Sequence, residues 1–312
     1  MRSHHCEYCD NLLPAIDTVN YCSHKKNNVD NIDSNAYYFM DNRLNSGKHV
    51  SRFSVRTVYN GYQHYQVNQR EHVLSKDRFL VINEGESFEN NLEQDNDAEG
   101  IIVAFNPNFL KYYLYHINHT DEQLIDNPFR KLDASLLFYE NSYEKSKRLD
   151  SHLRSLIKSI KQGKAEPIYY QQKFIDVLDE LVGVERYMKQ RIRKIKALKG
   201  KTREELYKRL STAKDFVDAN LDSSLSLEKI AHVSFLSPFH FLRSFNDCYG
   251  ITPYQYVKRE RLKKALFLVK HSHLDLSQIT SASGFENKRT FQRAYQKRYG
   301  VTPYAHLEAC RV

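Results

Sequence analysis

The chain has 312 residues, of which 41% are hydrophobic, and this length suits two domains that each bury a core. It contains no apolar run typical of a signal peptide or a transmembrane helix, and its five cysteines suggest no disulfide framework. We therefore expect a cytoplasmic protein rather than a secreted or membrane-embedded one.

The net charge of +9 is unevenly distributed along the chain. Residues 1–185 hold 21 Lys and Arg against 27 Asp and Glu, residues 186–200 hold 7 against none, and residues 201–312 hold 19 against 11. A cation-rich domain attracts the phosphate backbone of a nucleic acid, whereas an acidic one is repelled. The charge indicates a nucleic-acid partner for the C-terminal part. The alternative is that these cations only solvate helix faces.

Residues 1–30 carry a group of soft metal ligands. Cys6 and Cys9 form a Cys-x-x-Cys pair, and Cys22 and His24 follow at spacings that a tetrahedral zinc site accepts. The alternative is a tail with reduced thiols that binds no metal. We expect no other cofactor to be required.

Residues 36 to about 105 are rich in Tyr, Phe, Val and Thr and contain period-2 stretches such as residues 52–58. Asn60-Gly61 and Glu84-Gly85 interrupt these stretches, which is typical of strands joined by tight turns. The segment 76–86 resembles the strand pair of a cupin-like barrel. We therefore predict a cupin-like sensor domain within residues 31–185.

A cupin enzyme needs two His separated by one residue, a carboxylate and a later His, and no such run is present. His49, His64 and His72 are scattered, so we expect no catalytic metal in this domain. The aromatic residues near the first turn either line an effector cavity or simply pack a hairpin. The candidate cavity residues are Tyr59, Tyr62, His64 and Tyr65.

Residues 107–185 return to helical periodicity. Two apolar stripes separated by Pro167 consist of Leu149, Leu153, Leu156 and Ile160, and of Ile175, Leu178, Leu181 and Val182. The stripes form a dimer interface, or they pack on the barrel of the same chain, and the two uses are compatible. Residues 186–203 then form a strongly basic stretch that we interpret as a linker.

The C-terminal part contains one pattern twice, about fifty residues apart. The first copy is Leu227, Ile230, Ala231, Phe235, Leu236, Phe241, Arg243, Phe245, Tyr249, Gly250, Thr252, Pro253 and Tyr254. The second copy is Leu276, Ile279, Thr280, Gly284, Phe285, Phe291, Arg293, Tyr295, Tyr299, Gly300, Thr302, Pro303 and Tyr304. Apolar positions at helical spacing on either side of a break predict a helix, a tight turn and a second helix in each copy, which is a duplicated helix-turn-helix.

Helix start and stop signals support both units. Gly250 and Gly300 fit the left-handed position just after a helix. The start signals are Ser237 as a cap with Pro238 at the first helical position, Asp275 with Gln278 as a capping box, and Asn287 as a cap.

A predicted helix from Tyr254 to about Lys270 joins the two units rigidly, because its apolar residues recur at i, i+3, i+4 and i+7. These residues are Leu262, Ala265, Leu266 and Val269. A further helix, with a stripe of Leu206, Leu210, Ala213 and Val217, precedes the first unit and covers its core. Seven helices in about a hundred residues predict one compact all-α domain.

This arrangement resembles the DNA-binding domain of the AraC/XylS family of transcription regulators over about residues 204–308. The specific signature lies in the second copy and comprises Gly284, Phe285, Phe291, Arg293, Ala294, Tyr295, Lys297, Tyr299, Gly300, Val301, Thr302 and Pro303. Thr280 departs from the family, which usually places Ala there, and its hydroxyl needs a hydrogen-bond partner. The resemblance implies promoter binding, transcription activation and a cupin-like sensor.

In each unit we expect the second helix to enter the major groove by its N-terminal end, with its aromatic residues turned to the core. The expected contact residues are Pro238, Phe239, His240, Leu242 and Arg243 in the first unit, and Lys288, Arg289, Thr290, Gln292, Arg293 and Lys297 in the second. Arg289 and Gln292 suit guanine and adenine edges. His240 either packs or contacts phosphate. For Arg243 and Arg293 the alternatives to base contact are a phosphate contact or an intradomain ion pair.

The predicted fold class is α+β, with an N-terminal cupin-like β-barrel and helical dimerisation segment in residues 31–185 and a C-terminal all-α domain in residues 204–312. We interpret the chain as a non-enzymatic, effector-responsive regulator that binds double-stranded promoter DNA and RNA polymerase, forms a homodimer and has no membrane partner. The rival interpretation is a DNA-targeted enzyme that uses Cys6, Cys9 and Cys22 as thiol methyl acceptors. A third is a helical interaction module without affinity for DNA.

Overall fold

The structure is a computed structural model in which the chain divides into two compact units, Met1–Lys189 and Gln190–Val312. No helix in the described ranges is long and apolar enough to cross a membrane. The structure describes residues 34–41, 46–91, 98–120, 122–123, 136–139, 142–162, 166–196 and 199–311.

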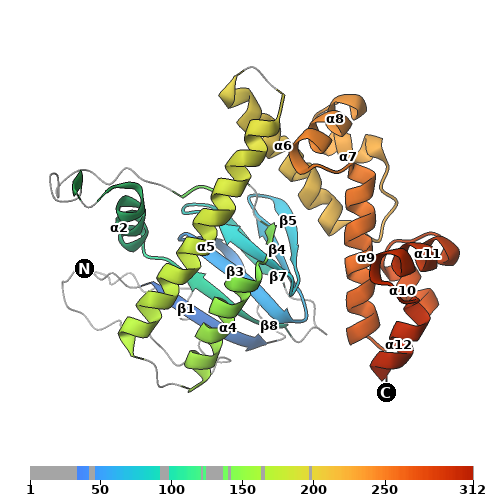
Figure 1. Ribbon diagram of the computed structural model, residues 1–312, viewed down its shortest axis with the longest axis horizontal. Coiled ribbons are helices and arrows are strands. Elements are labelled where there is room, and N and C mark those ends of the chain that lie inside the picture. Colours follow the sequence, from blue (N-terminus) through green and yellow to red (C-terminus); the bar gives the residue numbers. More distant parts are fainter. Residues whose placement is uncertain are drawn as a thin grey trace. The chain divides into compact units, whose positions relative to one another are not determined.

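The described strands of the N-terminal unit form two antiparallel sheets (Figure 1). The strands are β1 (Asn35–Asp41), β2 (Ser46–Val50), β3 (Ser54–Asn60), β4 (Gln63–Val67), β5 (Arg70–Leu74), β6 (Arg78–Ile82), β7 (Ser87–Asn91), β8 (Ala98–Ala104) and β9 (Ser142–Glu144). The five-stranded sheet has the order β1-β8-β3-β6-β9, and the four-stranded sheet has the order β2-β7-β4-β5. Gly61 and Gly85 adopt left-handed backbone angles at the two predicted turns, with φ of 64° and 83°.

The five-stranded sheet is buried on both faces, because alternate residues of each strand enter different cores. Val55 of β3 and Val81 of β6 belong to a cluster shared with helices. Val58 and Leu80, on the opposite face of the same strands, belong to a second cluster shared with the four-stranded sheet. This inter-sheet cluster comprises Phe39, Val58, Tyr65, Val67, Leu74, Leu80, Ile82, Phe88, Ala98 and Ile102. The α+β prediction is thereby confirmed.

The helices of the N-terminal unit are α2 (Pro107–Asn118), α4 (Lys147–Gln162) and α5 (Pro167–Lys194). Figure 1 shows α4 and α5 crossing one side of the sheets. Leu153 and Leu156 of α4 and Leu178 and Leu181 of α5 are fully buried in the cluster that contains Val55. Both predicted stripes are helical, and both pack on the sheet of the same chain.

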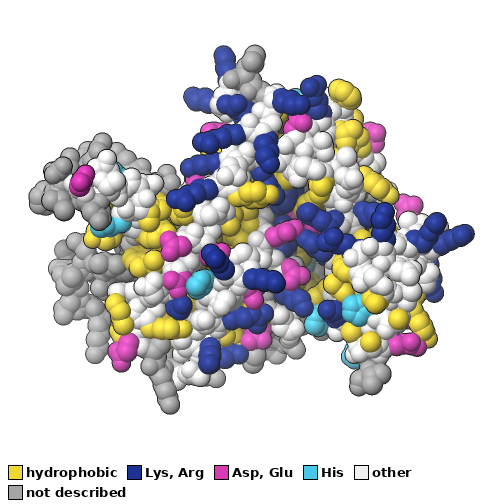
Figure 2. All heavy atoms as spheres, viewed as in Figure 1, with side chains coloured by type: hydrophobic (Ala, Val, Ile, Leu, Met, Phe, Trp, Pro, Cys, Tyr) yellow, Lys and Arg dark blue, Asp and Glu magenta, His cyan; other side chains and the backbone are white. Residues whose placement is uncertain are grey.

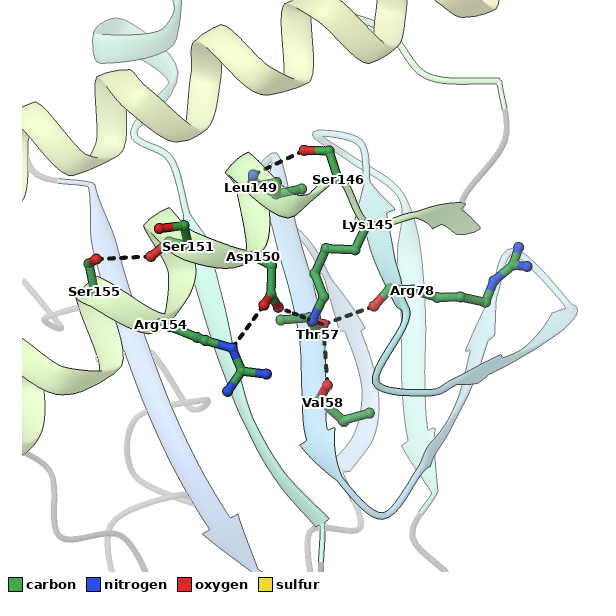
Figure 3. Close-up of polar contacts among 10 residues, drawn as sticks. All are labelled: Thr57, Val58, Arg78, Lys145, Ser146, Leu149, Asp150, Ser151, Arg154 and Ser155. Carbon is green, nitrogen blue, oxygen red and sulfur yellow. Dashed lines mark hydrogen bonds and ion pairs between the residues drawn. The ribbon is translucent and has the colours of Figure 1, made fainter. Parts of the chain in front are cut away.

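A small polar network attaches α4 to β3 (Figure 3). The ammonium of Lys145, whose side chain is 3% exposed, donates to Thr57 Oγ1 at 3.0 Å and pairs with Asp150 Oδ1 at 2.9 Å. Arg154 donates to the other carboxylate oxygen of Asp150 at 2.8 Å. Both cations also lie over the ring of Tyr59. Although burial alone raises the pKa of Asp150, its bonds to Arg154 and Lys145 hold that pKa below the usual value.

Two segments differ from the sequence-based interpretation. Strand β9 lies in a region expected to be helical, and its three residues are too few to give a periodic signal. Within the stretch 186–203, interpreted as a linker, α5 continues to Lys194 and the next helix begins at Gly200. Lys and Arg are good helix formers, and at a helix C-terminus they also complement the helix dipole.

The C-terminal unit contains the seven predicted helices within residues 199–311. They are α6 (Gly200–Ala219), α7 (Leu227–Val233), α8 (Pro238–Tyr249), α9 (Pro253–His271), α10 (Leu276–Ala282), α11 (Lys288–Tyr299) and α12 (Pro303–Arg311). Helix α9 serves both halves: its Tyr256 ring packs edge-on against Phe245 of α8, whereas its Leu262 and Ala265 belong to a core with Phe291 of α11.

The predicted capping interactions are confirmed. Ser237 accepts from the backbone N–H of His240 at 3.4 Å, and Asn287 accepts from that of Thr290 at 3.1 Å. Asp275 and Gln278 form a reciprocal capping box. The hydroxyl of Thr280, the departure from the family pattern, donates to the carbonyl of Leu276 at 2.7 Å and so has its partner.

Candidate nucleic-acid interface

Helix α8 of the first helix-turn-helix has one buried side and one exposed side. Phe241, Phe245 and Cys248 are buried, and the two phenylalanine rings lie 5.4 Å apart. The predicted contact residues lie on the other side: Pro238, Phe239, His240 and Arg243 are exposed, and Leu242 is half-buried. His240 is therefore not packed in the core. The exposed side of α8 begins with two apolar residues, Pro238 and Phe239, and Phe239 is 76% exposed.

Tyrosine residues on the buried side of α11, the second helix of the second helix-turn-helix, bind it to α12 and α9. The Tyr295 hydroxyl lies 3.0 Å from Nδ1 of His306 on α12, and the Tyr299 hydroxyl donates to the carbonyl of Leu262 on α9 at 3.1 Å. Burial raises the pKa of Tyr295, which therefore stays neutral. The predicted contact residues Lys288, Arg289, Thr290, Arg293 and Lys297 are exposed, and Gln292 is half-buried.

The cations on these two surfaces are available to an external anion. Among the residues that the structure describes, no ion pair is formed by Arg243, Lys288, Arg289, Arg293 or Lys297. Other cations of the same unit are paired, such as Arg209 with Glu205 at 3.1 Å. The alternative of an intradomain ion pair for Arg243 or Arg293 is therefore not realised within the described residues.

The turn of the second helix-turn-helix is locked against the loop that follows α6. Arg261 of α9 donates to the carbonyl oxygens of Leu221 at 2.9 Å and of Ser223 at 2.7 Å. Gly284, at φ +81°, lies against the Leu221 carbonyl, and a Cβ atom there would overlap that oxygen and crowd Arg261. This contact fixes the second helix-turn-helix on the loop that precedes the first one. Sequence reasoning singled out Gly284 but not Arg261, because the partners are far apart in the chain.

Phe235 occupies the position of the first turn that corresponds to Gly284. Its φ is +53°, a left-handed value that phenylalanine rarely adopts, and its side chain is 82% exposed. Phe235 and Phe239 thus place two exposed aromatic side chains at the start of α8.

Basic side chains are concentrated in the parts of the chain where the charge counts predicted them. Figure 2 shows Lys and Arg gathered along the C-terminal end of α5 and over the C-terminal unit. On α5 the last turn contains Arg191, Arg193 and Lys194.

The candidate effector residues of the N-terminal unit are not all brought together. Tyr59 packs against the cluster shared with the helices, whereas Tyr65 is buried in the inter-sheet cluster. Tyr62 and His64 contact each other edge-on at 5.6 Å. A separate pocket of about 250 Å³ is lined by Lys48, Gln66, Asn68, Gln69, Ser87, Phe88 and Glu89.

The candidate zinc ligands Cys6, Cys9, Cys22 and His24 lie outside the described residues. Within the described ranges no group of three or more His, Cys, Asp or Glu is arranged to hold a metal ion. Cys248 is buried and Cys310 is exposed, and neither forms a disulfide within the described residues.

Two family models match the chain, one in each unit. A model described as AraC-like ligand binding domain matches residues 37–177, and a model described as helix-turn-helix domain matches residues 230–309. The first therefore covers the two sheets with α2 and α4, and the second covers α8 and α11, the second helix of each helix-turn-helix.

Curated relatives and solved structures resemble parts of the chain. The probable transcriptional regulator LumQ of Photobacterium leiognathi is 33% identical over 28% of this chain and 36% of its own length. The regulatory protein PocR of Salmonella typhimurium is 31% identical over 32% of this chain and 33% of its own length. An AraC-type regulator from Chromobacterium violaceum is 26% identical over 33% of this chain and 91% of that chain, with a TM-score of 0.31.

This chain thus spans about a third of the length of the two curated relatives. The AraC-like ligand binding model and the helix-turn-helix model match successive parts of the chain, and the second coincides with the duplicated motif. The chain belongs to the AraC/XylS family.

Proposed function

We propose that this protein is a sequence-specific DNA-binding transcription regulator that responds to an effector. The observation that carries the proposal is the exposed side of α11, where Lys288, Arg289 and Arg293 form no ion pair among the described residues. Cations placed at the N-terminal half of a recognition helix meet base edges and phosphates when that helix enters the major groove.

The two units contribute differently to DNA binding. Arg289 and Gln292 of α11 carry donor pairs suited to guanine and adenine, so the second unit supplies most of the base reading. Phe239 and Leu242 of α8 suit thymine methyl groups and sugars. Each recognition helix then occupies one of two successive major grooves on one face of the duplex, about 34 Å apart.

The N-terminal unit supplies the effector response and self-association in this proposal. Its match to a ligand binding domain supports an effector, and the family membership supports activation through RNA polymerase. Homodimerisation through this unit is supported by large apolar side chains that its helices leave exposed, among them Tyr112, Ile117, Ile168 and Tyr187. We propose no catalytic step, no required cofactor and a cytoplasmic location, where promoter DNA is found.

Fluorescence anisotropy of the full chain with labelled promoter fragments, measured over a range of salt concentrations, tests the proposal. Logarithmic affinity should fall linearly with the logarithm of salt concentration. The double substitution Arg289→Ala with Arg293→Ala should weaken binding and reduce the salt slope by about 1 for each phosphate that is no longer neutralised. Arg209→Ala on α6 removes a cation already paired with Glu205 and should leave affinity and slope unchanged. Binding that is absent, or insensitive to both salt and the double substitution, would refute DNA recognition by α11.

A further inference from the structure

The inter-sheet core of the N-terminal unit contains a buried arginine. Arg56 lies on β3, on the same face as Val58, and its register partners are Leu80 and Ile102. Its side chain is 3% exposed. The guanidinium carbon lies 3.9 Å from the centre of the Phe88 ring and 5.3 Å from that of Tyr65, so Arg56 reaches from the five-stranded sheet to the four-stranded one.

Among the described residues, the charge of Arg56 has no counter-ion. No carboxylate there pairs with it, and its Nε and Nη1 atoms have no hydrogen-bond acceptor. The two aromatic rings compensate a cation only in part. An arginine buried without an acceptor is strongly disfavoured, and buried charges in proteins are normally paired. The neighbouring Arg78 shows the ordinary case: it is also buried, but it donates to the Ser142 hydroxyl at 2.8 Å.

The side chains around Arg56 indicate what kind of ligand would accept hydrogen bonds from its guanidinium. The inter-sheet cluster provides apolar contacts through Val58, Leu80, Ile102 and Phe88. Asn90 of β7 is buried in register with Tyr65, and its Oδ1 atom has no partner among the described residues. Phe88 also lines the pocket of about 250 Å³, so the same residue borders both that pocket and Arg56.

We propose that Arg56 is the anchor of an effector site for a small organic carboxylate with an apolar body. The carboxylate oxygens accept from the guanidinium, and the apolar body replaces contacts within the inter-sheet cluster. A monoanion matches the single charge of Arg56, whereas a phosphate dianion would remain half-neutralised. This inference rests on the effector-responsive function proposed above and adds the chemical class of the effector.

The test uses the dialysed full-length protein and matched pairs of probes. Acetate, butyrate, hexanoate, octanoate and benzoate are each compared with the corresponding primary amide, and inorganic phosphate is included. The shift in thermal unfolding midpoint is measured for wild type, Arg56→Met and the control Arg78→Met. We expect at least one carboxylate to stabilise wild type and Arg78→Met more than its amide does. In Arg56→Met the half-maximal concentration of that carboxylate should rise by about tenfold or more.

The proposal is overturned if no carboxylate exceeds its amide in wild type, if the preference persists in Arg56→Met, or if phosphate stabilises more than every carboxylate. Should Arg56→Met fail to fold, Arg56→Lys provides the second measurement. Lysine keeps the charge but not the planar donor array, so the preference should persist at a several-fold higher half-maximal concentration, and an unchanged value would count against the site. Salt-dependent DNA binding of the same variants is measured in parallel. If it persists while the carboxylate preference is absent, this inference fails and the DNA-binding function stands.

Discussion

Gly284 lies against the carbonyl oxygen of Leu221, so that the second helix-turn-helix is seated on the loop after α6 with no room for a side chain. We predict that Gly284→Ala destabilises the C-terminal unit, because the new Cβ overlaps this oxygen and crowds Arg261. The cost should be about 1 to 3 kcal/mol beyond that of a left-handed alanine. Urea unfolding followed by circular dichroism measures it.

Gly300→Ala is the matched control for this prediction. Gly300 has nearly the same left-handed φ, +78°, but no atom lies within 4 Å of a Cβ built there. It should cost only about 1 to 2 kcal/mol, the ordinary penalty of a left-handed alanine. Equal losses for the two substitutions would show that the contact with Leu221 does not restrict the turn.

If the N-terminal half of α11 faces the major groove, Arg289→Ala and Lys297→Ala should affect DNA binding in different ways. Arg289→Ala should relax base preference, with a loss of about 1 to 3 kcal/mol on the matched site only. Lys297→Ala, in the last turn of the same helix, should weaken binding to matched and mismatched sites equally. Competition binding with single-base variants of one promoter site distinguishes these outcomes. Identical profiles for the two variants would contradict the placement of α11 in the groove.

Helix α9 must remain unbroken for the two recognition helices to keep their spacing. We predict that Lys263→Pro abolishes specific binding, because proline removes a backbone hydrogen bond and kinks the helix at a cost of about 3 kcal/mol or more. The N-terminal unit should stay folded. Lys263→Ala, which removes the same ion pair with Glu260 at 3.3 Å but keeps the helix, serves as control. A folded Lys263→Pro protein that gives the full wild-type footprint would contradict the proposed spacing.

The Lys145–Asp150–Arg154 network should make the stability of the N-terminal unit depend on pH. The pKa of Asp150 is lower in the folded protein than its usual 3.8, so its stabilising effect is present above that value and is lost as pH falls through the folded pKa. Asp150→Asn should therefore lower the thermal unfolding midpoint at neutral pH, and the difference from wild type should shrink below about pH 4. Asp222→Asn changes an exposed carboxylate paired with Lys264 in the other unit and should show neither effect on the N-terminal unit. A pH-independent difference for Asp150→Asn would rule out the ion pairs as its cause.

Local signals in the sequence were sufficient for the C-terminal unit. Ser237, Asp275 and Asn287 cap helices through bonds to residues two or three positions away, so the sequence alone identifies these helix ends. The positions of Phe241 and Phe291 in helical stripes likewise assign their faces, and both are fully buried.

Local sequence signals could not predict the contacts between segments that are distant in the chain. Arg56 lies in a period-2 stretch whose alternation does not say which face meets the second sheet, and both faces are buried. The bonds of Arg261 to Leu221 and Ser223 join residues 38 to 40 positions apart. Strand β9 is recognised only through its pairing with β6. Each of these features depends on long-range packing rather than on local preference.

Because α9 contributes side chains to both cores of the C-terminal unit, the two recognition helices cannot be reoriented independently without disrupting a core. In the function proposed above, an effector therefore acts without bending the DNA-binding unit between its two helix-turn-helix motifs. We expect effectors to alter promoter occupancy, while the spacing of the bases contacted by one copy of this unit stays constant.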